Sequence, residues 1–106
     1  MHIEALREFA LSLKDVEEVC PFGPDNLVYK VSNKMFLLLS IDEDPLRFNV
    51  KCNPEYAIQL REEFPNAVLP GYHMNKKHWN TIVVDGTIQA KQLQQFILDS
   101  YALVRR

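Results

Sequence analysis

The sequence predicts an α+β domain in which an antiparallel β-sheet meander is flanked by N-terminal, central and C-terminal helices. Three observations predict this class. Apolar residues recur at helical spacing near both ends of the chain and once in its middle. The segments between them are short β-rich runs bounded by turn-forming residues. The 106 residues suffice for one core, so we expect a single domain over residues 1–106.

An amphipathic helix is predicted over residues 2–13, where apolar side chains recur every three or four positions. Two prolines and a glycine between residues 21 and 24 interrupt the chain after it. We expect a short edge strand within residues 16–22. The five acids from Glu4 to Glu18 alternate with bases, so we interpret them as a solvated face, not as an iron-delivery site.

Two β-rich runs, residues 27–32 and 35–41, are separated by Asn33–Lys34, which predicts a hairpin. The stretch DEDP at residues 42–45 makes the next turn. Residues 47–52 then alternate in polarity, so we expect two sets of side chains on opposite faces. The inward set is Phe48, Val50 and Cys52, and the more exposed outward set is Arg47, Asn49 and Lys51.

The central helix begins with a clear signal, because Asn53 can cap it and Pro54 suits its first position. Tyr56, Leu60 and Phe64 form its predicted buried stripe, and Pro65 ends it. Residues 81–84 predict a last strand, closed by Asp85–Gly86. The final helix is expected to begin near Thr87 and to bury Leu93, Ile97, Tyr101 and Val104.

Composition is that of a globular protein, with 47% hydrophobic and 25% charged residues. The formal net charge of −2 argues against indiscriminate binding of polyanions. The longest apolar run, residues 35–39, is far too short for a membrane helix, and the acidic N-terminus does not resemble a secretory signal. We therefore expect a cytoplasmic monomer without membrane contact. Cys20 and Cys52 are both predicted to be reduced core thiols.

The stretch PGYHMNKKHWN, residues 70–80, concentrates polar and aromatic groups that admit three interpretations. A metal site would use His73 and His78 with Cys52 or a carboxylate. Their spacing is not that of the helical pair in zinc proteases, so we expect no metal and no cofactor. A structural role would pack Trp79 into the core and place Gly71 at a tight corner.

The third interpretation of this stretch is contact with an anion. If Asn75 caps a single helical turn, free amides would face the same solvent region as the ammonium groups of Lys76 and Lys77, with His78 beside them. Catalysis is not supported, because the sequence holds no nucleophile elbow, phosphate loop or paired carboxylates with an acid–base role. We expect no catalytic residues and no enzyme.

Six blocks of the chain resemble the MmcQ/YjbR family of small bacterial proteins. They are CPFG (Cys20–Gly23), LVYKV…KMF (Leu27–Phe36), NVKCNPE (Asn49–Glu55), LREEFP (Leu60–Pro65), PGYHMNKKHWNTI (Pro70–Ile82) and LDSYALV (Leu98–Val104). The resemblance implies a frataxin-like (CyaY-like) fold. It also implies DNA binding, because the two hairpins of the family resemble the double wing of a phage transcription factor domain.

The residues support two kinds of partner. DNA would meet a basic side of the sheet with an aromatic residue for stacking, although the acidic tip at residues 42–45 would repel phosphate. The alternative is a binding module that uses residues 73–80 for an acidic protein or a small anionic ligand. The candidate contacts for either partner are Lys30, Lys34, Arg47, Lys51, Tyr72, His73, Asn75, Lys76, Lys77 and His78.

Overall fold

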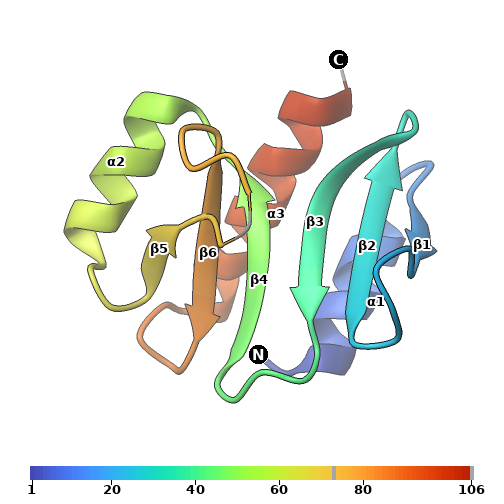
Figure 1. Ribbon diagram of the computed structural model, residues 1–106, viewed down its shortest axis with the longest axis horizontal. Coiled ribbons are helices and arrows are strands. Elements are labelled where there is room, and N and C mark those ends of the chain that lie inside the picture. Colours follow the sequence, from blue (N-terminus) through green and yellow to red (C-terminus); the bar gives the residue numbers. More distant parts are fainter. Residues whose placement is uncertain (73, 106) are drawn as a thin grey trace.

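The computed structural model describes residues 1–72 and 74–105 as a six-stranded antiparallel sheet with helices packed against one of its faces (Figure 1). In chain order the elements are α1 (Ile3–Ser12), β1 (Glu17–Val19), β2 (Asn26–Val31), β3 (Lys34–Ser40), β4 (Leu46–Lys51), α2 (Pro54–Glu63), β5 (Val68–Pro70), β6 (Trp79–Val84) and α3 (Ala90–Arg105). The strand order is β1-β2-β3-β4-β6-β5, so a four-stranded meander is extended by a hairpin. The predicted α+β class is confirmed.

The core lies between the sheet and the helices. In Figure 1, α1 and α3 lie behind the sheet, and α3 packs on β2, β3 and β4. Phe36 of β3 meets Tyr101 of α3 edge-to-face, with 5.4 Å between the ring centroids. The four residues predicted to anchor the final helix are all buried: Leu93, Ile97, Tyr101 and Val104. Helical periodicity therefore identified this face correctly.

Helix α2 begins as predicted, because the Oδ1 atom of Asn53 accepts hydrogen bonds from the amides of Glu55 and Tyr56. Its buried face was only partly predicted. Ala57 and Leu60 are buried against the sheet, whereas Tyr56 is 39% exposed. Leu60 is buried as expected, and Phe64 packs partly buried against the core. The stripe therefore differs only at its first position, where Ala57 takes the place of Tyr56.

Two further features differ from expectation. The final helix begins at Ala90, not near Thr87, because the carboxylate of Asp85 accepts a hydrogen bond from the Thr87 amide and holds a turn there. The short edge strand β5 was not predicted. It has three residues and includes Pro70, so the sequence carries little strand signal.

The hairpin between β2 and β3 contains a β-bulge. Its turn lies at Ser32–Asn33, one residue earlier than predicted, and both residues have positive φ. Tyr29 is in register with Leu37, but Lys30 is in register with Met35. Phe36 is the extra residue, so it faces the helices together with Leu37 while Met35 lies on the other face.

Strand β4 has the predicted alternation but not the predicted exposure. Phe48 and Val50 belong to the core, and the predicted outward set lies on the opposite face. However, Asn49 is only 4% exposed, because residues 71, 72 and 74–78 belong to a segment that passes in front of β4 and β6 (Figure 1). Outward direction in this strand therefore does not mean contact with solvent.

The predictions for Trp79 and Cys20 are wrong. Trp79 is in register with Lys51 on the face away from the helices and is partly exposed, so its ring does not pack in the core. Cys20 follows the edge strand β1 and is exposed, whereas Cys52 is buried as expected. Among the described residues, no helix combines the length and apolar character needed to cross a bilayer.

The edge strand β1 pairs with β2 and is also tied to α1 through one carboxylate. Glu18 accepts hydrogen bonds from the guanidinium of Arg7, at 3.0 and 3.1 Å, and from the hydroxyl of Tyr29. The bond from Arg7 lowers the pKa of Glu18 below its ordinary value. Glu18 is thus part of a structural network, in contrast to the solvated face expected for it.

Candidate ligand-binding site on the open face of the sheet

The face of the sheet away from the helices, here called the open face, contains a polar hollow of about 290 Å³. Cross-strand pairing builds it, because Ser40 is opposite Arg47 and Asn49 is opposite Thr81. Tyr72 comes from the segment between β5 and β6, whose described residues 71, 72 and 74–78 cross this face. The full lining of the polar hollow is Ser40, Glu43, Arg47, Asn49, Tyr72 and Thr81.

A short hydrogen-bonded chain fixes one wall of the polar hollow. The amide of Tyr72 donates to Oγ1 of Thr81 at 2.9 Å, and this hydroxyl donates to Oδ1 of Asn49 at 2.5 Å. Asn49 and Thr81 are both buried. The wall is therefore rigid and polar, and it ties the crossing segment to the central strands.

Arg47 has the most unusual environment in the polar hollow. Its Nε atom is buried and is the one buried side-chain nitrogen or oxygen, among the described residues, that lacks a hydrogen-bond partner. An unpaired buried donor costs about 1–3 kcal/mol, and more when the group is charged. An unpaired buried group of this kind in a native fold calls for an explanation, such as strain, a functional role or an ordered water or ion.

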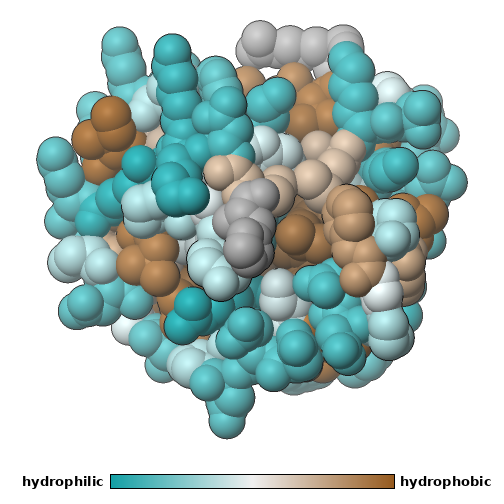
Figure 2. All heavy atoms as spheres, viewed as in Figure 1, coloured by the Kyte–Doolittle hydropathy of each residue, from teal (hydrophilic) through white to brown (hydrophobic). Residues whose placement is uncertain are grey.

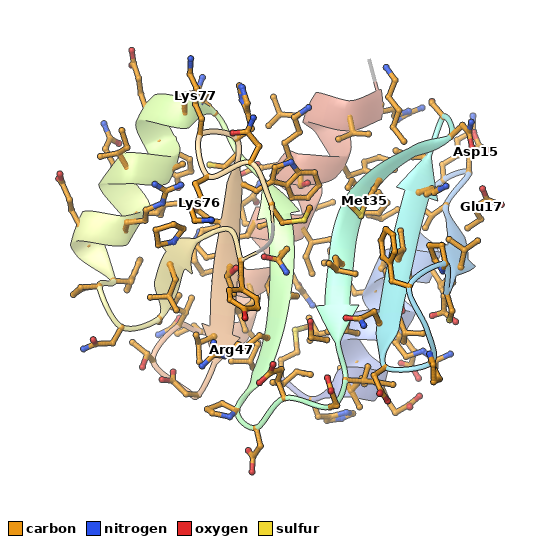
Figure 3. All side chains as sticks on the ribbon, viewed as in Figure 1. Asp15, Glu17, Met35, Arg47, Lys76 and Lys77 are labelled. Carbon is orange, nitrogen blue, oxygen red and sulfur yellow. The ribbon has the colours of Figure 1, made fainter. Side chains whose placement is uncertain are left out.

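A second, apolar hollow of about 290 Å³ adjoins the first on the open face. Figure 2 shows hydrophobic side chains gathered over β2 and β3, next to hydrophilic ones over the lower part of β4. Met35 points out from β3 on this face (Figure 3), where the bulge has placed it. The apolar hollow is lined by Phe22, Asn26, Met35, Leu38 and Met74.

The crossing segment is held at its start by a close backbone approach. The Gly71 amide donates to the carbonyl of Trp79 at 3.0 Å. A Cβ atom at residue 71 would lie 2.8 Å from Cβ of Trp79 and 3.0 Å from Cβ of Met74. Only glycine fits there without displacing its neighbours, so the structural role predicted for Gly71 is supported.

Asn75 caps a single helical turn, as predicted. Its Oδ1 accepts from the Lys77 amide at 3.0 Å, and its carbonyl accepts from the amides of His78 and Trp79. The turn is clamped by Arg61 of α2, which the sequence did not single out. The Arg61 guanidinium donates to the carbonyls of Lys76 and Trp79 and, at 2.7 Å, to Oδ1 of the buried Asn80.

The predicted basic residues do not form one site. Arg47 and Tyr72 share the polar hollow, whereas Lys77 lies near the opposite end of the open face from Arg47 (Figure 3). Lys30 is in register with Glu17, whose carboxylate reduces the positive charge there. Lys34 follows the β2–β3 turn, Lys51 ends β4 beside the residue 75–78 turn, and the exposed acidic tip at residues 42–44 lies at the other end of the sheet.

The metal interpretation gains no support from the described residues, which contain no group of three or more histidine, cysteine or carboxylate side chains placed to hold an ion. His73, one of the predicted ligands, lies outside the described residues. Burial raises the pKa of the Cys52 thiol to about 11, so it is protonated near neutral pH. A protonated thiol is a poor nucleophile.

Sequence reasoning identified Arg47 and Tyr72 but missed the rest of the site. Asn49 and Thr81 are polar residues within strands, and the outward position of Asn49 was the available signal. The apolar lining could not be read from MFLLLS, because a continuous apolar run hides the alternation between faces.

Comparison with known proteins gives a consistent result. The family model described as YjbR matches residues 11–103. The uncharacterized protein YbdF of Escherichia coli O157:H7 is 37% identical over 101 residues, which cover 95% of this chain and 82% of YbdF. The uncharacterized protein YjbR of Escherichia coli K12 is 32% identical over 72 residues, covering 68% of this chain and 60% of that protein.

Solved structures agree with the sequence matches. The crystal structure of the Deinococcus radiodurans protein DR2400 has a TM-score of 0.93 at 39% identity, covering 97% of this chain and 78% of that one. The crystal structure of a Pseudomonas syringae protein has a TM-score of 0.82 at 29% identity, covering 99% of this chain and 100% of that one. The resemblance inferred from the sequence motifs is therefore confirmed, and this chain belongs to the YjbR family.

Proposed function

We propose that the open face of the sheet binds a small ligand through an anionic group, with Arg47 as the cationic contact. The observation that carries this proposal is the position of the Arg47 side chain, which lines the polar hollow and whose Nε has no hydrogen-bond partner among the described residues. A guanidinium group matches the geometry of a carboxylate or phosphate and forms charge-assisted hydrogen bonds with either. A bound anion would accept hydrogen bonds from the part of this group that lines the hollow, whereas Nε itself is covered by protein atoms.

The surroundings of Arg47 fit a small ligand better than an extended polyanion. The polar hollow is close to the lower size limit of small-molecule sites, and its wall is fixed by buried Asn49 and Thr81. Glu43 lines the same hollow, so its carboxylate would oppose a bare anion and repel a phosphate backbone. We expect modest affinity for simple anions.

Titration with acetate and with inorganic phosphate, followed by amide NMR shifts, tests this proposal. We expect saturable shifts at Tyr72 and Thr81. Replacing Arg47 by glutamine should weaken binding about tenfold or more, because a charge-assisted hydrogen bond is worth about 1.5–3 kcal/mol. The matched control is Lys76→Gln, which removes an exposed charge from the same face and should leave the affinity unchanged. Equal affinities for Arg47→Gln and the unaltered protein would refute the proposal.

DNA binding is the second candidate, and one observation favours it. Lys51, Lys76 and Lys77 gather at one end of the sheet, around the turn of residues 75–78. This cluster could contact a few phosphates. The acidic tip at residues 42–44 is exposed at the opposite end, so the cluster would act alone and binding would be weak and strongly dependent on salt.

The double variant Lys76→Ala/Lys77→Ala separates the two candidates. Both side chains are exposed, so we expect its free energy of unfolding to stay within about 0.5 kcal/mol. If DNA is a partner, the variant should bind unrelated duplexes more weakly and lose up to about two phosphate contacts from the salt dependence. Lys14→Ala/Lys91→Ala removes the same charge from other exposed sites and is the control. Absence of duplex binding by the unaltered protein at low salt would eliminate DNA as a partner.

A further inference from the structure

We infer that the ligand is amphipathic, with its anionic group at Arg47 and an aromatic body in the apolar hollow. The inference rests on the proposed function and extends it by naming the chemical class of the ligand. It follows from three features of the open face: the two hollows are contiguous, their linings differ in polarity, and exposed aromatic side chains lie at both.

The contiguity of the hollows follows from the register of the strands. Asn26 of the apolar hollow is opposite Ser40 of the polar one, and both side chains are partly exposed. Directly opposite residues in antiparallel strands have Cβ atoms only about 4.5–5.5 Å apart. One ligand can therefore cross from one hollow to the other without leaving the surface of the sheet.

The apolar hollow suits a flat aromatic group. Its walls include Met35, Met74 and Leu38, and methionine thioethers adapt their shape and make favourable contacts with aromatic rings. Phe22 is 63% exposed at this hollow, and Tyr72 is 67% exposed at the polar one. Large exposed aromatic side chains beside a hollow are typical of surfaces that bind partners.

The sizes of the hollows support a ligand that occupies both. Each measures about 290 Å³, whereas small-molecule sites span roughly 300–1,000 Å³. Either hollow alone is at the lower limit of this range, and the two together lie well within it. The carboxylate of Glu43 weakens binding of a bare anion, so burial of an apolar body is the expected source of most of the affinity.

Three matched probes test the inference: 2-naphthoate, which has both groups, acetate, which has the anion alone, and 2-naphthol, which is neutral and aromatic. In NMR titrations of the whole chain we expect 2-naphthoate to bind at least about tenfold more tightly than acetate and than 2-naphthol. Its shifts should include the amides of Met35 and Met74 together with those of Tyr72 and Thr81. Acetate should shift only the second pair.

Variants assign each part of the probe to its hollow. Met35→Gln preserves side-chain length but adds a polar amide, so it should weaken 2-naphthoate binding severalfold and leave acetate binding unchanged. Arg47→Gln should weaken both. Ile58→Gln makes a similar change at a 53% exposed site on α2 and should affect neither.

The outcomes distinguish this inference from the proposed function. Acetate binding that depends on Arg47, with 2-naphthoate no tighter, would overturn the amphipathic ligand and leave the anion site intact. Binding of 2-naphthoate and 2-naphthol with equal affinity, unaffected by Arg47→Gln, would overturn both. If none of the three probes shifts the open-face amides, both the inference and the proposed function would be overturned.

Discussion

Phe36→Ala is expected to lower the free energy of unfolding by about 3–5 kcal/mol, the range typical of a buried phenylalanine. The Phe36 side chain is fully buried and lies edge-to-face against Tyr101, so the substitution would leave a cavity between the sheet and α3. The bulge in β3 is what directs this ring to the helices. Equilibrium unfolding in urea, followed by circular dichroism, measures the loss.

Phe22→Ala is the matched control for this prediction, because it removes the same side chain from a site that is 63% exposed. Its stability should change by no more than about 0.5 kcal/mol. A loss below about 1 kcal/mol for Phe36→Ala would show that the ring does not occupy the core. The position of the bulge would then be wrong as well.

Arg61→Met should cost about 2–3 kcal/mol, the second largest effect we expect. The methionine keeps much of the apolar stem but removes every donor of the guanidinium. The buried Oδ1 of Asn80 and the carbonyls of Lys76 and Trp79 would lose their bonds to residue 61. The turn of residues 75–78 should loosen, which faster amide hydrogen exchange at His78 and Trp79 would reveal.

The control for Arg61→Met lies beside it on the same helix. Glu62 is exposed, and Glu62→Met should change stability by about 0.5 kcal/mol or less. Arg61→Lys should retain part of the stability, because one ammonium cannot replace a planar fork of donors. Unchanged amide exchange at His78 and Trp79 in Arg61→Met would contradict the clamping role of Arg61.

The parts of the fold that depend on local sequence were predictable. The cap at Asn53 and the buried face of the final helix were confirmed, because each depends on residues within a few positions of one another. The alternation of β4 was confirmed for the same reason. Local chemistry was sufficient for the fold class and for the element order except strand β5.

The errors about burial and side-chain contacts concern residues that are distant in the sequence. Trp79 is aromatic and was expected in the core, but its register with Lys51 places it on the open face. Asn49 is buried because a segment more than twenty positions later crosses over it. Arg61 was missed because its acceptors lie 15 to 19 residues further along the chain. Tertiary packing decided these positions, and no local pattern reports it.

The candidate site was predictable only in part, and for the same reason. Arg47 and Tyr72 were named as contacts for an anion or DNA, yet their common hollow depends on β4 pairing with both β3 and β6. Lys76 and Lys77 were predicted as contacts because of their positive charge. The distinctive property of Arg47 is its buried unpaired nitrogen, which no sequence pattern reveals.

The bulge in β3 also bears on how this strand can evolve. Met35 and Phe36 point to opposite faces, as consecutive strand residues do, and the bulge decides that Met35 lines the binding face while Phe36 supports the core. Selection for a different ligand can therefore change residue 35, while selection for stability conserves residue 36. Deletion of a single residue from this part of the strand would instead exchange the faces to which these side chains point, and would disrupt the binding face and the core together.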